Sequence, residues 1–502
     1  MEPLLDVEQL RASDAWAIEE RGMPGIDLME RAAEGLRGVV EDVAPEGRVV
    51  VVCGGGNNGG DGYAVARLLR ERGREVHVLW TSAPETLKGD AGTNARRLGG
   101  EGVERFAPQA LDGAAVVVDA ILGTGFRGAP REDAAHAIEA IDDAGVPVVA
   151  CDVPSGVEAS TGAVRGPAIR AVATATFHAA LPGLWIAPGK QRAGEVTVVD
   201  IGIPSEDPGY PVEPRMWLID HDSLRTYPRR GAESTKFASG HVLVAGGSRG
   251  LTGAPCLAST AAMRAGAGYV TVCVPAALND IFEIKLTEVM SVPLPDDGAG
   301  GHTKAGVDGV LEKAERGGAL VLGPGLGRTD DAFAFARRLA RKATVALVLD
   351  ADGLNAHAGK RLAELAARDA PTILTPHAGE LARLLDTDSA AVERHRLEHA
   401  RRAAATSGAI VVLKGDDTIV AEPDGRVGVS RGGSPALATA GTGDVLSGVL
   451  GAFLARGMEP FDAACAAVFA HAEAGRRAAA ALRGPDGVIA GDVARELAST
   501  LE

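Results

Sequence analysis

The chain has 502 residues, of which 46% are hydrophobic and 24% charged, and its formal net charge at pH 7 is −16. This composition is typical of a folded protein with large cores and excludes an intrinsically disordered chain, while the length predicts two to four domains. The acidic balance excludes a nucleic-acid partner, because a phosphate backbone requires a basic surface.

The cysteines and the N-terminus indicate the compartment. No C-x-x-C pair occurs, so we expect buried thiols in a reducing environment at Cys53, Cys151, Cys256, Cys273 and Cys465. The acidic N-terminus lacks the apolar core of a secretory signal, and no apolar run approaches the ~18–20 residues that span a membrane. We therefore expect a cytoplasmic protein with no membrane partner.

The first half of the chain predicts a parallel sheet. Short apolar, β-branched runs alternate with segments of helical periodicity, and these runs cover residues 49–53, 76–80, 116–119 and 146–151. Such alternation is typical of βαβ units, in which helices cover both faces of the sheet. Ligands of these folds bind beyond the carboxyl ends of the strands.

A glycine-rich loop follows the first of these strands. Residues 54–62 read Gly-Gly-Gly-Asn-Asn-Gly-Gly-Asp-Gly, which contains the G-x-G-x-x-G spacing of dinucleotide-binding folds. A dehydrogenase also needs an acidic residue at the end of the second strand, but that strand is followed by Thr81 and Ser82. The dehydrogenase interpretation is therefore weak.

Oxygen-bearing side chains occur after three separate strands. Asn58, Asp119 and Ser155 offer the hard oxygen ligands that suit Mg²⁺, Ca²⁺ or an alkali ion better than Zn²⁺. Each residue alone is more typical of a turn. Together, at one edge of a sheet, they favour a site.

Four motifs of this half resemble the NAD(P)H-hydrate epimerase, or YjeF N-terminal, family over about residues 5–215. They are residues 22–32, 54–62, 119–125 and 152–156. The resemblance implies K⁺ bound by Asn58, Asp119 and Ser155, and proton transfer by Asp152. Arg127 replaces a lysine of some relatives, so the second proton-transfer group stays open. The substrates implied are the hydrates NADHX and NADPHX, bound by Asn57, Asn58, Gly59, Gly60, Asp61, Gly123, Thr124, Gly125, Phe126, Arg127, Gly128 and Ala129.

A proline-rich stretch divides the chain. Residues 202–230 contain five prolines and interrupt both periodicities, and a second series of predicted strands begins at residue 241. We predict two doubly wound α/β domains: residues 1–217, which are Rossmann-like, and residues 218–502. The later strands are predicted at residues 241–245, 269–274, 320–323, 345–350, 372–375 and 410–413.

The segment Gly441-Thr442-Gly443-Asp444 is the most informative of the second half. Apolar residues follow it with helical spacing, so its backbone N–H groups and the helix dipole are expected to attract an anion. Asp444 beside that anion would then act as a base. The alternative is a glycine-rich turn that Asp444 caps.

Two further strand ends carry candidate residues. Lys414 suits a nucleotide phosphate, although a solvated lysine is an equally good interpretation. His377 follows a proline at a strand end, where a ligand contact competes with a structural role. The glycine-rich loops 246–255 and 323–327 are not P-loops, because no Gly-Lys-Ser/Thr follows them.

These motifs resemble the ADP/ATP-dependent NAD(P)H-hydrate dehydratases, which are ribokinase-like, over about residues 225–500. The resemblance implies Asp444 as catalytic base, with Ala254, Gly325 and His377 at the hydrated substrate. It implies Mg²⁺ and a nucleotide, with ADP favoured over ATP by the two-domain fusion. The nucleotide-binding residues implied are Lys414, Gly415, Asp416, Asp417, Thr418, Gly441, Thr442 and Gly443.

The resulting hypothesis is a bifunctional repair enzyme, an isomerase and lyase, that we expect to form a homo-oligomer. Its epimerase half interconverts the R- and S-forms of hydrated NAD(P)H, and its dehydratase half restores the S-form to NAD(P)H while ADP becomes AMP and phosphate. The alternative is a ribokinase-like small-molecule kinase fused to a non-catalytic ligand-binding module.

Overall fold

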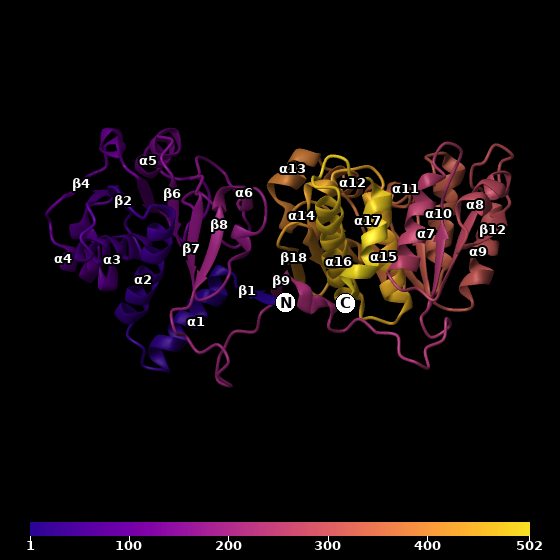
Figure 1. The fold of residues 1–502 in the computed structure, drawn as a ribbon, viewed down its shortest axis with the longest axis horizontal. Helices are drawn as coiled ribbons and strands as arrows, with labels where there is room; N and C mark the ends of the chain where they lie inside the picture. Colours follow the sequence, from indigo (N-terminus) through magenta and orange to yellow (C-terminus); the bar gives the residue numbers. More distant parts are fainter. Residues whose placement is uncertain (502) are drawn as a thin grey trace. The chain divides into compact units, whose positions relative to one another are not determined.

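The computed structural model describes residues 1–501, which form two compact units. One unit contains Pro3–Met216, and the other contains Met1–Glu2 together with the chain from Trp217 onward. Both units are α/β, as predicted, and Figure 1 shows each as a sheet flanked by helices. Among residues 1–501 no helix has the length and apolar character needed to cross a bilayer.

The N-terminal unit is built on a seven-stranded sheet in the order β4-β3-β2-β5-β6-β7-β8, in which every pair of neighbours is parallel. The strands are β2 (Val49–Cys53), β3 (Val76–Trp80), β4 (Val103–Arg105), β5 (Val116–Ala120), β6 (Val148–Cys151), β7 (Ala173–Phe177) and β8 (Glu195–Val199).

Both faces of this sheet are buried, since alternate residues of β2 join different cores. Val49 and Val51 pack with α2 and α3, whereas Val50 and Val52 pack with α5. This burial on both faces explains why the strand segments are almost continuously apolar in the sequence. The helices are α1 (Val7–Glu19), α2 (Gly25–Val43), α3 (Asn57–Glu71), α4 (Gly89–Leu98), α5 (Glu132–Asp143) and α6 (Lys190–Ala193).

The C-terminal unit contains an eleven-stranded sheet in the order β1-β9-β18-β17-β16-β15-β14-β13-β10-β11-β12. The pairs from β16 to β12 are parallel, while β16, β17 and β18 pair antiparallel. The strands are β1 (Glu2–Leu4), β9 (Met216–Ile219), β10 (His241–Ala245), β11 (Tyr269–Pro275), β12 (Met290–Leu294), β13 (Ala319–Leu322), β14 (Ala346–Leu349), β15 (Thr372–Leu374), β16 (Ile410–Leu413), β17 (Ile419–Ala421) and β18 (Val427–Ser430).

One face of this sheet supports a large apolar core. Val242, Val321 and Val348 pack there with side chains of α7, α15, α16 and α17. The intervening strand residues, such as Leu243 and Leu347, are also buried. The helices are α7 (Gly253–Arg264), α8 (Asn279–Lys285), α9 (Val307–Ala314), α10 (Asp330–Lys342), α11 (Ala351–Asn355), α12 (Ala378–Leu385), α13 (Ser389–Arg394), α14 (Arg396–Ser407), α15 (Thr442–Ala455), α16 (Pro460–Ala481) and α17 (Ala490–Glu496).

The strand order places a crevice-forming switch point in each sheet. In the N-terminal unit the strand order reverses between the parallel neighbours β2 and β5, and in the C-terminal unit it reverses between β10 and β13. Ligands of open α/β sheets bind at such points, beyond the carboxyl ends of the strands. The predicted loops after β2, β5, β10 and β13 all begin there.

Candidate active sites

A cavity of about 690 Å³ lies at the switch point of the N-terminal unit. It is lined by the loop before α3, by residues 121–126 after β5, and by Asp152 after β6. Helix α1 contributes Arg11 and Asp14, and His178 after β7 closes another side. A concave cavity with several convergent polar groups is the usual form of a small-molecule site.

Glycines allow the two central strand-end loops of this cavity to touch. A Cβ on Gly54 would lie 1.9 Å from the carbonyl oxygen of Ile121, and one on Gly59 would lie 2.1 Å from the carbonyl oxygen of Gly54. A side chain on Gly54 would therefore push the two loops apart, and one on Gly59 would clash within the loop between β2 and α3. Asn57 and Asn58 begin α3 directly above this contact, where Asn57 is exposed and Asn58 is buried.

Asn58, Asp119 and Ser155 all lie at this edge of the sheet. The Asn58 side chain is buried, and neither its oxygen nor its nitrogen has a hydrogen-bond partner. The Ser155 hydroxyl donates to Asp119 at 2.6 Å, and the Ser155 N–H donates to the other Asp119 oxygen at 2.7 Å. Burial raises the pKa of Asp119 to about 6, although these hydrogen bonds oppose the rise.

These three residues fit the hard-oxygen chemistry of an alkali ion. The orphaned amide oxygen of Asn58 is a buried neutral donor without any protein partner, and such a group is satisfied by a ligand or a cation. Among residues 1–501, His, Cys, Asp and Glu side chains form no group of three that could hold a metal ion. Oxygen ligands of this kind suit a hard cation better than a soft transition metal.

Asp152 occupies a strained turn at the edge of the cavity. Its φ is 67°, a left-handed conformation that non-glycine residues rarely adopt and that is concentrated at functional sites. The Thr124 N–H and the Thr176 hydroxyl donate to its two carboxylate oxygens at 3.3 and 3.4 Å. Burial dominates these hydrogen bonds and raises the pKa of Asp152 to about 6.

Two further carboxyl groups line the same cavity. Asp61 is buried, and its pKa is raised well above the usual range by burial and then by the charges of Asp152 and Asp14. Asp14 on α1 was not predicted as a site residue, and burial of its carboxyl raises its pKa to about 6 even though the residue keeps contact with solvent. Asp14 lies far from every glycine-rich motif, so no sequence pattern marked it as a site residue.

The loop after β5 separates this cavity from a second one of about 690 Å³. Gly123, Thr124, Gly125 and Phe126 line the first cavity, whereas Arg127 and Ala129 line only the second. Arg127 is largely exposed and lies 3.9 Å from Glu8, and the Gly128 N–H donates to Glu158. Gly59 and Gly60 are buried in the first turn of α3. The predicted residues thus surround one edge of the sheet.

In the C-terminal unit, Asp444 lies in the first turn of α15. Gly441 is the N-cap of this helix and has a φ of 92°. The Thr442 hydroxyl donates to the carbonyl oxygens of Leu437 and Thr439. Burial, followed by the charge of Asp350, raises the pKa of Asp444 to about 7, and Lys414 opposes the rise. A carboxyl group with such a pKa is suited to general base catalysis at neutral pH.

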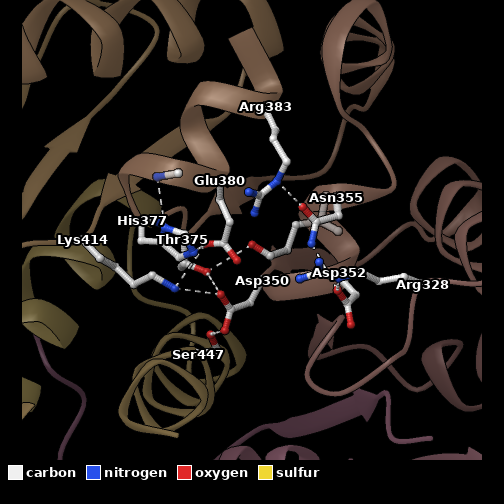
Figure 2. A network of polar contacts seen from close by, with 12 residues as sticks. Arg328, Asp350, Asp352, Asn355, Thr375, His377, Glu380, Arg383, Lys414 and Ser447 are labelled. Atoms are coloured by element: carbon white, nitrogen blue, oxygen red, sulfur yellow. Dashed lines mark hydrogen bonds and ion pairs between the residues drawn. The ribbon is translucent and has the colours of Figure 1, made fainter. Parts of the chain in front are cut away.

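The Asp350 carboxylate contacts residues that follow β15 and β16 and also residue Ser447 on α15 (Figure 2). It is buried at the end of β14, and its carboxylate accepts hydrogen bonds from Thr375 at 2.8 Å and from Ser447 at 2.7 Å. The Lys414 ammonium lies 3.1 Å from the same carboxylate. Since Ser447 is one turn after Asp444 on α15, this network holds the position of the candidate base relative to the sheet.

Lys414 points into an acidic cluster rather than into solvent. Its ammonium also lies 3.8 Å from Glu380, and a Cβ on Gly443 would lie 3.3 Å from the ammonium nitrogen. Burial opposes the charge, but Asp350 and Glu380 outweigh burial and raise the pKa of Lys414. The ammonium therefore stays charged beside the amide loop of α15.

His377 has a structural role as the N-cap of α12. It caps α12: its Nδ1 accepts from the Gly379 N–H at 3.0 Å, and its own N–H donates to Glu380 at 2.9 Å. With Nδ1 acting as acceptor, Nε2 carries the proton and lies 3.6 Å from Glu380. The ring is more than half exposed, so its outer edge stays open to a ligand.

The loop after β16 is closed by its own hydrogen bonds. The Thr418 hydroxyl donates to the Gly415 carbonyl at 2.7 Å, and the Asp416 carboxylate accepts from the Gly433 N–H. Asp417 is buried and accepts from Arg396 at 2.9 Å. The ordered backbone of the segment 414–418 is consistent with a binding loop.

Ala254 and Gly325 meet at the switch point between β10 and β13. A Cβ on Gly325 would lie 3.3 Å from the Ala254 side chain, and the Ser248 hydroxyl donates to the Gly325 carbonyl. Ala254 is in the first turn of α7, the helix that packs along α15. Small side chains at these positions keep the strand ends accessible.

Asp350 and Glu380 are the functional candidates that sequence reasoning missed here. The motif Asp350-Ala351-Asp352 followed a predicted strand, so its position was a signal, but the partner of the carboxylate was not visible. Asp352 instead binds Arg328 at 2.9 Å and Asn355 at 3.1 Å. Figure 2 shows this second network beside the first.

Gly441→Ala is expected to abolish most of the activity of the C-terminal site. A Cβ at this left-handed position would lie 2.6 Å from Leu257, so the start of α15 must shift. Gly457→Ala is the matched control, because Gly457 has a φ of 82° but open space around it. Both variants should lose about 1–2 kcal/mol of stability from backbone strain. Only Gly441→Ala should lose activity, so equal activity of the two variants would contradict a role for Gly441 in the C-terminal site. Thermal unfolding and turnover measure the two effects.

Two family models match the chain, one in each unit. The family model for NAD(P)H-hydrate dehydratase matches residues 242–497, and the model for the YjeF-related protein N-terminus matches residues 25–183. A solved ADP/ATP-dependent NAD(P)H-hydrate dehydratase from Bacillus subtilis, co-crystallised with ATP and Mg²⁺, is 27% identical and covers 57% of this chain and 98% of its own, with a TM-score of 0.49.

Curated relatives match both units at once. The bifunctional NAD(P)H-hydrate repair enzyme Nnr of Moorella thermoacetica is 40% identical, with 98% of this chain and 95% of that protein covered. The enzyme of the same name from Escherichia coli is 34% identical, with coverage of 97% and 91%. Because these relatives extend over nearly the whole sequence, the chain belongs to the family of bifunctional NAD(P)H-hydrate repair enzymes.

Proposed function

We propose that residues 1–217 epimerise the R- and S-forms of NADHX and NADPHX, and that residues 218–502 dehydrate the S-form to NAD(P)H. The dehydration consumes ADP and yields AMP and phosphate. The observation that carries the proposal is the arrangement of Asp444, a carboxyl with a pKa of about 7, beside the half-buried Lys414 ammonium and the amide loop that begins α15.

Dehydration requires the hydroxyl group on the ring to become a better leaving group, because hydroxide leaves poorly at neutral pH. Asp444 accepts the hydroxyl proton, and the oxygen attacks the terminal phosphoryl group of ADP, which releases AMP. The nitrogen lone pair then expels phosphate, and loss of a proton from the adjacent ring carbon restores the double bond. The backbone amides of Gly441 and Gly443 are proposed to bind the transferred group, and one such donor contributes roughly 10²–10³ in rate.

Lys414 supplies the fixed positive charge of this site. Its contacts with Asp350 and Glu380 hold the ammonium near Gly443, where negative charge develops on the phosphoryl oxygens. Ala254, Gly325 and His377 are proposed to contact the hydrated nicotinamide, and the loop 414–418 the nucleotide. Mg²⁺ bound with the nucleotide would neutralise phosphate charge.

In the N-terminal unit, Asp152 is proposed to transfer a proton during inversion of the hydrated carbon. Asn57, Asp61 and the loop 123–129 would bind the substrate around it, and K⁺ would be held by Asn58, Asp119 and Ser155. The cation would supply a fixed positive charge next to the acidic cavity.

The proposal also includes a cytoplasmic location and a homo-oligomeric assembly. Cell fractionation measures the location, and light scattering measures the assembly.

The test is to mix the protein with a mixture of hydrated NADH epimers, Mg²⁺ and either ADP or ATP, and to follow the absorbance of reduced nicotinamide. Complete conversion of both epimers with ADP, together with release of free phosphate, is the expected result. Recovery of a stable phosphorylated substrate would instead identify a small-molecule kinase. Conversion of only one epimer would contradict the epimerase assignment.

Removal of K⁺ is expected to slow epimerisation and to leave dehydration of the S-form unchanged. The reason is that the orphaned Asn58 oxygen and the Asp119 carboxylate belong to the N-terminal unit only. Exchange into tetramethylammonium chloride and back into potassium chloride measures the effect at constant ionic strength. Loss of both activities in parallel would contradict the assigned position of the cation.

A further inference from the structure

Four carboxyl groups and an unpartnered amide line the cavity of the N-terminal unit, and one of the four is Asp90 on α4. Asp14 on α1, Asp61 on α3 and Asp152 after β6 line the same space of about 690 Å³. Asn58 also lines it, is only 8% exposed, and has no hydrogen-bond partner for either side-chain atom. A buried amide without a protein partner indicates that a polar ligand completes this cavity.

Asp61 and Asp152 have opposite surroundings. Asp61 is 8% exposed, and among residues 1–501 no N–H or hydroxyl group donates to its carboxyl group. Asp152 is less buried, and it accepts hydrogen bonds from Thr124 and Thr176. Donors stabilise the ionised form of a carboxyl group, whereas burial without donors stabilises the protonated form.

The charged neighbours of Asp61 strengthen this difference. Burial first, and then the negative charges of Asp152 and Asp14, raise the pKa of Asp61 well above that of an exposed aspartate. Asp61 therefore favours its protonated form more strongly than Asp152, whose pKa burial raises to about 6. The titratable or charged residues around the cavity and Asp61 are Arg11, Asp14, Asp90, Cys151, Asp152 and His178.

Inversion of a carbon that carries a hydroxyl group and a ring nitrogen needs both an acid and a base. When the hydroxyl oxygen loses its proton, the carbon–oxygen bond becomes a carbonyl and the carbon–nitrogen bond breaks. The nitrogen keeps the electron pair of that bond and takes a proton. Rotation of the open-chain aldehyde and closure onto its other face return both protons and give the opposite epimer.

We infer that Asp61 is the acid that protonates the ring nitrogen, and that Asp152 is the base that accepts the hydroxyl proton, in a ring-opening epimerisation. This inference rests on the proposed epimerase function of the N-terminal unit. The two carboxyl groups exchange no net proton with solvent over one cycle.

The inference is tested with Asp61→Asn in the full-length protein. General acid catalysis contributes about 10²–10⁴ in rate, so kcat/KM for epimerisation of hydrated NADH should fall by about that factor. Dehydration of the S-form by the C-terminal unit serves as the internal control for folded, active protein. Asp27→Asn, an exposed carboxylate on α2 outside the cavity, is the matched charge control and should epimerise normally.

The pH profile separates an acid from a structural residue. In the wild-type protein kcat/KM should rise through about pH 6 as Asp152 ionises. It should fall again at higher pH, which we call the alkaline fall, as Asp61 with its raised pKa loses its proton. Asp61→Asn should retain the acidic rise and lose the alkaline fall. Asp61→Glu keeps an acid and should recover part of the rate, with its own alkaline fall.

The outcomes distinguish the inference from the function on which it rests. If the wild-type protein does not interconvert the epimers, the proposed epimerase function is wrong. If it does, an alkaline fall that persists in Asp61→Asn overturns the inference. Equal losses of activity in Asp61→Asn and Asp61→Glu overturn it as well, because a restored acid must restore part of the rate.

Discussion

Asp444→Asn is expected to lower the dehydration rate by about 10²- to 10⁴-fold, the usual contribution of a general base. The amide cannot accept the hydroxyl proton, although it matches the carboxyl group in shape. Epimerisation in the same chain should continue, since its candidate residues lie in the other unit. The absorbance of reduced nicotinamide after addition of S-hydrate, Mg²⁺ and ADP measures the loss.

Asp369→Asn is the matched control for this change. Asp369 is an exposed aspartate of the same unit, before β15, so the charge removed is the same but lies on the surface. It should dehydrate at the wild-type rate. Parallel loss of both activities in Asp444→Asn would indicate misfolding and would contradict the role of a base.

The pH dependence of dehydration gives a second measurement on Asp444. Because a base must be ionised and the pKa of Asp444 is about 7, the rate should rise as the pH passes through 7 and then level. The raised pKa also means that ionisation of this residue lowers stability, progressively from its unfolded pKa of about 3.9 up to about 7. Asp444→Asn should therefore be at least as stable as the wild type at pH 8, which thermal unfolding measures.

Arg396→Met is expected to destabilise the C-terminal unit by about 3–5 kcal/mol, the usual cost of removing one partner of a buried ion pair. Arg396 is 2% exposed, and its guanidinium donates to the buried Asp417 at 2.9 Å. It also donates to the carbonyl oxygen of Lys414 at 3.1 Å. The variant should unfold at lower denaturant concentration and show a raised KM for ADP.

Arg402→Met on the same helix is the control for loss of charge. Arg402 is exposed on α14, so its replacement should change stability by less than about 0.5 kcal/mol and leave KM unchanged. Equal shifts in the two variants would show that Arg396 does not support the binding loop. Because the chain has two units, unfolding is followed with the dehydratase activity as well as by circular dichroism.

Much of the architecture could be predicted from local patterns. Apolar runs flanked by glycine-rich loops indicated parallel strands, and parallel strands bring their carboxyl ends to one edge. For this reason Asp152 and the segment 441–444 were recognisable as site candidates without knowledge of any contact. The fold class of both units is confirmed, while the roles of the individual site residues stay predictions.

The partners of these residues were not predictable in the same way. Asp14 lies on α1, 43 residues before the start of α3, and only the packing of α1 beside the switch point brings it to the cavity that Asp61 lines. Lys414 allowed two interpretations, a phosphate ligand or a solvated side chain. Its position between Asp350 and Glu380 follows from β14, β15 and β16 being neighbours in the sheet.

The amino-acid sequence by itself determined which loops end the strands and which carry glycine, aspartate and asparagine, because these features depend on neighbouring residues only. The tertiary structure decided which carboxyl groups are buried together and which have hydrogen-bond donors. This burial and these donors raise or lower the pKa values of Asp61, Asp152 and Asp444, because a pKa depends on desolvation and on charges that are distant along the chain but close in space.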